Sequence, residues 1–239
     1  MTSRLVEPVA VITGASRGLG LALSRALVGD GWLVIGDART ETELTAATRD
    51  LGGPGRMIAV AGDVADPEHR QRLANLASES AGPKSDGLRL LVNNASFLGP
   101  SPQPLLQDYP LQTLRQVFEV NYFAPLGLIQ LLIPLMAGDG VIINVTSDAG
   151  VEGYAGWGGY GSSKAALEQL SRVLSAEEPQ LRIYWVDPGD MNTRMQQEAF
   201  PGQDVSDRPP PEDSLPGLLE LAQGKRPSGR YQARSMGPA

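Results

Sequence analysis

Tyr160 and Lys164 are the two side chains whose spacing in this sequence most clearly suggests chemistry. They lie four residues apart in a segment with helical periodicity, which places both side chains on one helix face with Cβ atoms about 5 to 6 Å apart. A free tyrosine has a pKa near about 10, and a neighbouring ammonium group stabilises the phenolate and lowers that pKa. The pair therefore predicts acid–base catalysis suited to carbonyl–alcohol interconversion. The alternative is a packed tyrosine beside a solvated lysine.

Ser147 is placed to work with this pair. It ends the buried apolar run 141–146, so it should lie at the carboxyl edge of a strand, where open α/β sheets bind their ligands. Its hydroxyl would hydrogen-bond a substrate oxygen and orient that oxygen toward Tyr160. The alternative is a serine that only caps a turn.

A proline near Asn121 gives that residue a local argument of its own. The pattern predicts one long helix over 111–136, interrupted by Pro125. Proline has no N–H to donate to the carbonyl four residues back, and that carbonyl belongs to Asn121. We expect a kink there and a carbonyl released from the helix, although a tolerated kink without function is the alternative.

Gly14, Gly18 and Gly20 form a glycine-rich turn between the first predicted strand and the first predicted helix. Glycines let the backbone approach a ligand closely, and a helix N-terminus offers unpaired N–H groups to an anionic pyrophosphate. The spacing differs from the widespread G-x-G-x-x-G pattern. Its position still favours nucleotide binding over a structural turn.

Short apolar runs alternate with helical segments along the chain. The runs are 9–13, 33–36, 57–61, 88–92, 141–145 and 181–186. They carry almost no charge, which is typical of strands covered on both faces, as in a parallel sheet. The pattern predicts a single-domain α/β chain over 1–239, a Rossmann-type doubly wound parallel sheet of about seven strands with helices on both faces. A last short strand is expected at 229–233.

The proline-rich stretch 196–216 predicts a long loop that ends in a short helix near 215–222. We expect a substrate loop at about 190–214, roofing an apolar pocket. The pocket residues would be Phe97, Leu98, Tyr154, Trp157, Met191, Met195 and Phe200. Asp148, Glu152 and Asp190 lie near the same motifs; they would favour a cationic substrate, or else be solvated loop acids.

Composition narrows the possible functions. Hydrophobic residues are 41% and charged residues 20% of the chain, which are ordinary globular values. The sequence has no cysteine and a single histidine, His69, so we expect no disulfide, no metal site and no histidine-based triad. His69 itself is expected on an exposed helix surface.

The net charge of −7 argues against nucleic-acid binding. Because 1–8 lacks an apolar signal region and 126–136 is too short to span a bilayer, we expect a cytoplasmic protein with no membrane partner.

Together these motifs resemble the short-chain dehydrogenase/reductase family, in its short single-domain branch. The motifs, in order, are Thr13-Gly14-x-x-x-Gly18-x-Gly20, Asp63-Val64, Asn93-Asn94-Ala95, Asn121, Ser147, Tyr160, Lys164 and Pro188-Gly189. The resemblance covers nearly the whole chain. It implies that Tyr160 is the general acid in reduction, with Lys164 as its pKa-lowering partner and ribose ligand. It also implies that Asn121 completes a proton relay by holding a water. Where the family usually has glycine after Asn-Asn-Ala, this chain has Ser96.

The resemblance further implies a nicotinamide dinucleotide cofactor. The cofactor-binding residues it implies are Gly14, Ser16, Arg17, Gly18, Leu19, Gly20, Ala38, Arg39, Thr40, Asp63, Val64, Asn93, Ala95, Tyr160, Lys164, Pro188, Gly189 and Thr193. Asp63 would contact the adenine amino group, and Thr193 the nicotinamide carboxamide. Asn93 would stabilise the sheet beside the cofactor.

The end of the second strand predicts which cofactor is used. An acid there selects NAD through the ribose 2′-hydroxyl, whereas an arginine pairs with the 2′-phosphate of NADP. Counting from Gly20, the acid's position falls on Ala38, with Arg39 next. Asp37 falls one residue early, where a strand side chain points the other way. We expect NADP(H) to be preferred over NAD(H), although a small shift at the strand end would put Asp37 in the acid's place.

The sequence thus predicts an NADP(H)-dependent oxidoreductase that interconverts a ketone or aldehyde with a secondary or primary alcohol by hydride transfer. The alternative is an NAD(P)-binding sensor or scaffold of the same fold without catalysis. The expected partners are a small-molecule substrate and further copies of the chain. The resemblance implies a homodimer or homotetramer formed through the helices that contain Asn121 and Tyr160.

Overall fold

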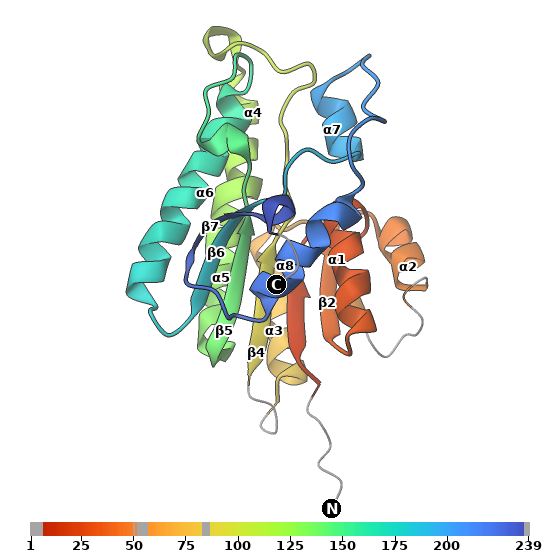
Figure 1. Cartoon of the computed structure of the whole chain (residues 1–239), viewed down its shortest axis with the longest axis vertical. Helices are drawn as coiled ribbons and strands as arrows, with labels where there is room; N and C mark the ends of the chain where they lie inside the picture. The colour runs from red at the N-terminus through yellow and green to blue at the C-terminus, as the bar shows by residue number, and fades with distance from the viewer. Residues whose placement is uncertain (1–6, 50, 52–56, 83–86, 237–239) are drawn as a thin grey trace, which may run out of the picture.

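The computed structural model describes residues 7–49, 51, 57–82 and 87–236. The expectation that 1–8 is not a signal peptide falls mostly on residues 1–6, which lie outside the described residues. Within the described part, strands and helices alternate along the chain (Figure 1).

One seven-stranded parallel sheet forms the centre of the structure, in the order β3-β2-β1-β4-β5-β6-β7. Its strands are β1 (Val9–Ile12), β2 (Leu33–Ala38), β3 (Met57–Ala61), β4 (Leu88–Asn93), β5 (Met136–Val145), β6 (Arg182–Asp187) and β7 (Gly229–Gln232). The predicted doubly wound fold is confirmed. The strand order reverses between β1 and β4, and ligands of such sheets bind outside the carboxyl ends at that point.

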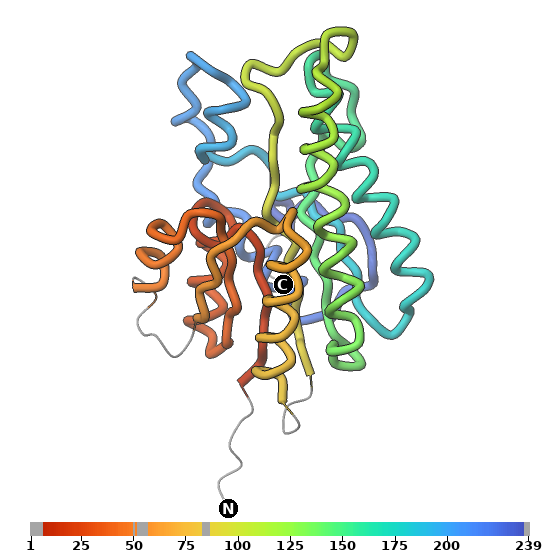
Figure 2. Tube along the Cα trace, turned by 180° about the vertical axis from the view of Figure 1, so that it is seen from behind, coloured from red at the N-terminus to blue at the C-terminus, as the bar shows by residue number. Residues whose placement is uncertain are grey.

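Helices cover both faces of the sheet because successive side chains of each strand point to opposite faces. The helices are α1 (Gly18–Gly29), α2 (Glu41–Arg49), α3 (Pro67–Ser80), α4 (Leu111–Phe118), α5 (Ala124–Leu132), α6 (Gly158–Glu177), α7 (Arg194–Ala199) and α8 (Leu215–Ala222). On β1, Ala10 and Ile12 belong to the core under α1 and α8, whereas Val9 and Val11 belong to the core under α3, α5 and α6. Figure 2 shows this second layer from behind.

The predicted interruption of the long helix is confirmed, and it takes the form of a π-helical turn. Glu119–Phe123 separates α4 from α5, and the Ala124 N–H donates to the Glu119 carbonyl five residues back. Pro125 lies in the first turn of α5, where its missing N–H is tolerated. By length and composition the run Leu111–Leu135 could cross a membrane, but α5 packs its buried leucines and isoleucine in the core with α3.

The predicted substrate loop contains more structure than expected. α7 forms within it at Arg194–Ala199, because the Thr193 hydroxyl caps the helix by accepting from the Gln196 N–H at 3.3 Å. α8 has the predicted bounds, Leu215–Ala222. Its proline lies in the first turn of the helix, a position that needs no N–H donor.

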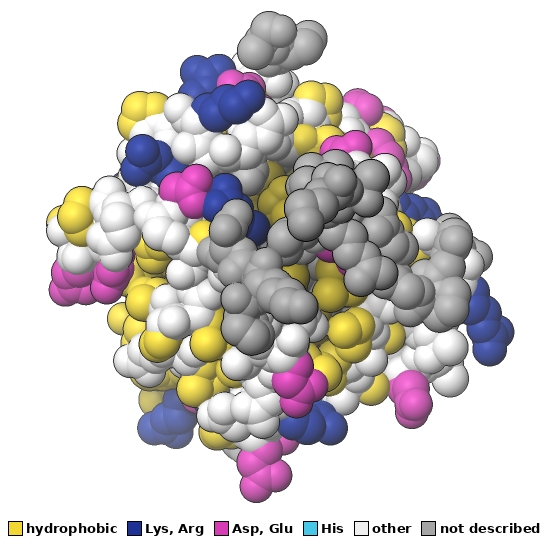
Figure 3. Space-filling model, turned by 90° about the horizontal axis from the view of Figure 1, so that it is seen from below, with side chains coloured by type: hydrophobic (Ala, Val, Ile, Leu, Met, Phe, Trp, Pro, Cys, Tyr) yellow, Lys and Arg dark blue, Asp and Glu magenta, His cyan; other side chains and the backbone are white. Residues whose placement is uncertain are grey.

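Charged side chains of both signs are dispersed over the face where the strands begin. Figure 3 shows this face from below, with lysines and arginines scattered among acidic and apolar side chains. In the visible part of this face, basic side chains lie beside acidic ones.

Substituting alanine at two glycines should change the free energy of unfolding in opposite directions. A Cβ at Gly217 in α8 would lie 2.2 Å from the Ala233 carbonyl oxygen, a backbone atom that cannot rotate away, whereas a Cβ at Gly29 meets nothing within 4 Å. We expect Gly217→Ala to lower the free energy of unfolding by about 1–3 kcal/mol. Gly29→Ala should raise it by up to about 1 kcal/mol. Urea unfolding measures both, and an unchanged Gly217→Ala protein would contradict the packing described here.

Candidate active site

A cleft of about 1050 Å³ opens at the carboxyl ends of the strands. The turns after β1 to β6 all contribute to its lining. Among the expected site residues, Gly20, Asn93 and Asn121 lie behind the lining and the others line it. The seven apolar residues expected in a substrate pocket all line it, as do Asp148 and Asp190, but Glu152 is not among the lining residues.

The glycine-rich turn is held in place from the neighbouring strand. The Asn94 side-chain amide donates to the carbonyls of Thr13 at 2.8 Å and Gly14 at 3.2 Å, and the Thr13 hydroxyl accepts from the Asn94 N–H at 3.0 Å. Gly14 and Gly18 have φ of +68° and +54°, which favours glycine. A Cβ at Gly20 would lie 2.3 Å from the Gly14 carbonyl oxygen, so only glycine lets α1 pack so close. Asn94 is a functional residue that the sequence motif contained without revealing its role.

The acid at the end of β2 points into the protein. Asp37 is 1% exposed; its Oδ1 accepts from the Gly14 N–H at 2.8 Å, and its Oδ2 lies 2.9 Å from His69 Nε2. His69 is fully buried, so the prediction of an exposed histidine is wrong. The helical pattern of α3 did not reveal a partner that lies on β2. Arg39 is exposed at the same end of the cleft, where Arg17 forms an ion pair with Glu43 at 3.4 Å.

Tyr160 and Lys164 lie one turn apart on α6, on the same side of the helix as predicted. Lys164 Nζ lies 5.5 Å from the centroid of the Tyr160 ring and donates to the Val145 carbonyl at 2.7 Å. Both residues are buried, at 7% and 2% exposure. The amine is therefore directed to Val145, the last residue of β5, which immediately precedes Thr146 and Ser147.

Burial reverses the expected effect on the tyrosine. It raises the pKa of the Tyr160 phenol above its usual value, a side-chain hydrogen bond with Ser96 opposes this, and the nearby Asp187 and Asp148 carboxylates add to the increase. Burial also lowers the pKa of Lys164 to about 7. The expected lowering of the phenol's pKa is therefore not found in this structure, because burial, which disfavours phenolate, has the largest effect on it.

Ser147 is at the strand end, as predicted, and its proton already has an acceptor. Its hydroxyl donates to Asp148 Oδ1 at 2.8 Å and accepts from the Ala149 N–H at 3.2 Å. The Tyr154 hydroxyl donates to the other oxygen of the same carboxylate at 3.2 Å. A substrate oxygen would compete with Asp148 for the Ser147 proton.

The Asn121 side chain links the loop after β4 to α6. Its Oδ1 accepts from the Phe97 N–H at 2.8 Å and from the Ser96 hydroxyl at 3.1 Å. Its Nδ2 donates to the Phe97 carbonyl at 3.0 Å and to the Ser163 hydroxyl at 2.9 Å. The side chain is thus engaged at both ends, and the release of the Asn121 backbone carbonyl to hold a water stays a prediction.

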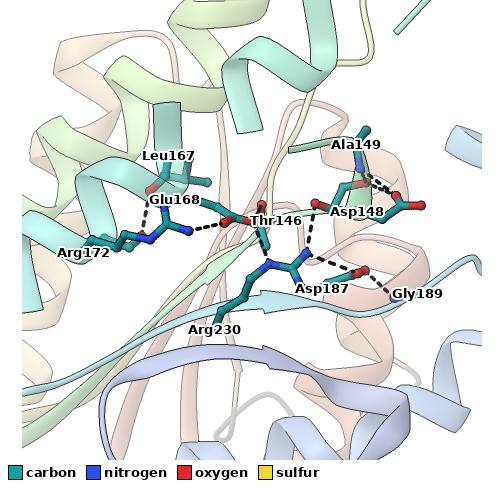
Figure 4. Close-up of polar contacts among 11 residues, drawn as sticks. Thr146, Asp148, Ala149, Leu167, Glu168, Arg172, Asp187, Gly189 and Arg230 are labelled. Carbon is teal, nitrogen blue, oxygen red and sulfur yellow. Dashed lines mark hydrogen bonds and ion pairs between the residues drawn. The ribbon is translucent and has the colours of Figure 1, made fainter. Parts of the chain in front are cut away.

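A network of charged groups joins the ends of β5 and β6 to α6 and β7 (Figure 4). Glu168, 1% exposed on α6, accepts from the Thr146 hydroxyl and from Arg230 Nε, both at 3.0 Å. Arg230 also reaches the Ser147 carbonyl at 3.4 Å and Asp187 Oδ2 at 3.5 Å. A buried carboxylate needs such partners to offset its lost hydration. The network fixes the ends of β5 and β6 to α6 and β7, and sequence reasoning missed it because its members lie far apart in the chain.

The comparison with known proteins agrees with this geometry. The profile of the family described as short chain dehydrogenase matches residues 8–204. The chain belongs to the short-chain dehydrogenase family. It is therefore an NAD(P)-dependent oxidoreductase with the Rossmann-type fold described above.

Individual members of the family show how close the similarity is. Benzil reductase ((S)-benzoin forming) of Saccharomyces cerevisiae is 33% identical over 221 residues, covering 89% of this chain and 80% of its own. Sepiapterin reductase of Mus musculus is 32% identical over 203 residues, covering 80% and 77%. A short-chain dehydrogenase of Escherichia coli CFT073, complexed with NADPH, superposes with a TM-score of 0.83 at 27% identity, covering 96% of this chain and 98% of its own.

The buried Lys164 amine should make stability depend on pH. Its pKa falls from 10.5 to about 7 on folding, so between these values the unfolded chain holds a proton that the folded chain has released. Raising the pH through this window therefore favours the folded chain. Relative to Lys164→Met, the wild-type free energy of unfolding should rise by up to about 1.4 kcal/mol per pH unit.

Urea unfolding of both proteins at about pH 6.5, 8 and 9.5 measures this difference, since the contributions of all other groups cancel in the comparison. Parallel pH profiles for the two proteins would show that the amine keeps its proton in the folded chain.

Proposed function

We propose that the protein reduces a ketone or aldehyde to the alcohol, and catalyses the reverse oxidation, with NADP(H) as the preferred cofactor. The observation that carries this proposal is the position of Ser147, Tyr160 and Lys164, which line one cleft together with the glycine-rich turn. Relatives named as reductases support the direction.

The cleft fits a nicotinamide dinucleotide. The residue before α1, Arg17, makes no side-chain capping bond among the described residues, so the first N–H groups of the helix are available to a pyrophosphate. Asp63 would hold the adenine, Lys164 the nicotinamide ribose and Thr193 the carboxamide. The bound nicotinamide supplies or accepts the hydride.

The protein's own contribution is to orient the carbonyl and to provide the proton. Because burial raises the pKa of Tyr160, the phenol keeps its proton at neutral pH and can give it to the substrate oxygen during reduction. Ser147 would turn its hydroxyl from Asp148 to that oxygen. The Lys164 amine, next to a water held by the Asn121 carbonyl, would then return a proton to Tyr160 and take one back from that water.

Aromatic side chains favour an aryl ketone as substrate. The Trp157 ring lies 5.9 Å from the Tyr160 ring in an edge-to-face arrangement and 5.9 Å from the Phe200 ring. Aromatic rings prefer such contacts with one another, so a planar substrate ring would pack well here. The reductase named for benzil, a compound with two aryl rings and two ketones, supports this choice.

Three observations support the preference for NADP(H). Both oxygens of Asp37 already accept hydrogen bonds, from Gly14 and from His69, and so compete with a ribose hydroxyl for this acid. Arg39 is exposed at the cleft, where it could pair with a 2′-phosphate. A structural neighbour was solved with NADPH.

Self-association through the helices that contain Asn121 and Tyr160 is also part of the proposal. Leu111 is 66% exposed on α4, and Phe123, in the π-helical turn that follows, is 50% exposed. A homodimer or homotetramer formed through this surface would remove both apolar side chains from water.

Tyr160→Phe should abolish turnover while leaving cofactor affinity within about twofold, because only the transferred proton is lost. We expect kcat for an aryl ketone to fall by about 10²- to 10⁴-fold. NADPH oxidation with a panel of ketones measures turnover, and NADPH fluorescence measures affinity. Tyr154→Phe, at the rim of the same cleft, is the matched control and should keep most activity. Substantial turnover by Tyr160→Phe would remove that residue from the mechanism.

Arg39→Leu should lower kcat/KM with NADPH by at least about tenfold and leave kcat/KM with NADH nearly unchanged, because only NADPH carries a 2′-phosphate for the guanidinium to bind. Arg39→Lys should retain part of the preference through its charge. Steady-state kinetics with both cofactors measures the ratio. A wild-type kcat/KM at least as high with NADH as with NADPH would defeat the proposed preference.

A further inference from the structure

The only histidine in the sequence lies in a closely fitted buried site next to the glycine-rich turn. His69 is fully buried on α3, between Asp37 of β2 and Arg72 of its own helix. A Cβ at Gly62 would lie 2.1 Å from His69 Nδ1, so glycine is required there for the ring to fit. The proposed reaction assigns no role to this group.

The donors around the ring determine where its proton lies. Arg72 approaches His69 Nδ1 at 3.0 Å and also donates to the Ala61 carbonyl at 3.1 Å. A guanidinium only donates, so Nδ1 must accept, and a neutral imidazole then carries its single proton on Nε2. Nε2 therefore donates to Asp37 Oδ2 at 2.9 Å.

The carboxylate that receives this bond supports the turn. Asp37 Oδ1 accepts from the Gly14 N–H at 2.8 Å, and the Asp37 carbonyl accepts from the Ala15 N–H at 2.7 Å. Both carboxylate oxygens thus accept a hydrogen bond, an arrangement that suits the ionised form. Burial and the Asp63 charge raise the pKa of Asp37, and the bonds from His69 and Gly14 oppose that increase. Without the His69 donor, the buried carboxylate would lose a main source of its stabilisation.

We propose that His69 is a positioning residue for the dinucleotide: held by Arg72, its Nε2–H fixes the Asp37 carboxylate, which in turn fixes the Gly14 N–H and so holds the glycine-rich turn in the conformation that receives the cofactor. The dinucleotide's pyrophosphate is common to NADP(H) and NAD(H). Loss of this support therefore weakens both to the same extent, unlike a change at Arg39. Dinucleotide binding is the readout, so a failure of carbonyl reduction is a separate result.

Two substitutions of similar size separate positioning from simple packing. In His69→Gln the side-chain amide reaches the place of Nε2 and can donate to Asp37, whereas in His69→Asn it reaches only the place of Nδ1. We expect the Gln variant to bind NADPH and NADH within about threefold of wild type. The Asn variant should bind both about tenfold or more weakly, as expected for a lost hydrogen bond to a charged group. Fluorescence titration measures affinity, and circular dichroism with thermal unfolding checks the fold.

The single histidine also permits a direct measurement on the unaltered protein. ¹⁵N NMR of the imidazole should show one neutral ring with its proton on Nε2, and its signals should shift when NADP⁺ is added. A ring protonated on Nδ1, or Gln and Asn variants that are folded and bind NADPH as tightly as wild type, would overturn the proposal. Should a variant fail to fold, the tautomer and its response to NADP⁺ in the wild-type protein decide the question.

Discussion

Burial of ionisable groups at the carboxyl edge of the sheet is the constraint on which the site depends. Each such group loses its hydration and must find a partner or give up its charge. Asp37 is paired with His69, and Glu168 is paired with Arg230. Among the described residues, the Lys164 amine is hydrogen-bonded to a backbone carbonyl instead of a carboxylate, and burial lowers its pKa. At this edge of the sheet the carboxylates are therefore held in fixed positions, whereas the Lys164 amine has a pKa of about 7.

This difference in pairing suits the two ends of the cleft to two tasks. A cofactor turn must be rigid before the ligand arrives, since ordering it on binding would cost affinity. Fully paired groups such as Asp37 provide that rigidity. A proton-transfer site needs groups whose charge can change, and a partly compensated amine beside a buried phenol meets this need. Arg230 contacts both the Ser147 carbonyl and Asp187, and Asp187 accepts from the Gly189 N–H, so the ends of β5 and β6 keep their spacing.

The sheet and the catalytic helix could be predicted because their signals are local in the sequence. Strands covered on both faces are uniformly apolar, and the four-residue spacing of Tyr160 and Lys164 fixes their relation on one helix. Pro125 likewise predicted an interruption of the long helix. The surroundings of His69 could not be predicted, because its partner on β2 is 32 positions away and a polar residue on a helix is usually exposed. The pKa of Tyr160 was missed for the same reason: spacing shows a neighbour but not the degree of burial.

Ser96 shows how one departure from the family pattern can alter the site without disturbing the fold. Its hydroxyl donates to Asn121, and its side chain also bonds to Tyr160, where it opposes the increase in the phenol's pKa. A glycine at this position could do neither. Because Asn121 also holds Phe97 and Ser163, the added hydroxyl connects the π-helical turn, the loop after β4 and the catalytic phenol. The pKa of Tyr160 is thus set by its burial, by Ser96 in the loop after β4, and by the Asp148 and Asp187 carboxylates at the ends of β5 and β6.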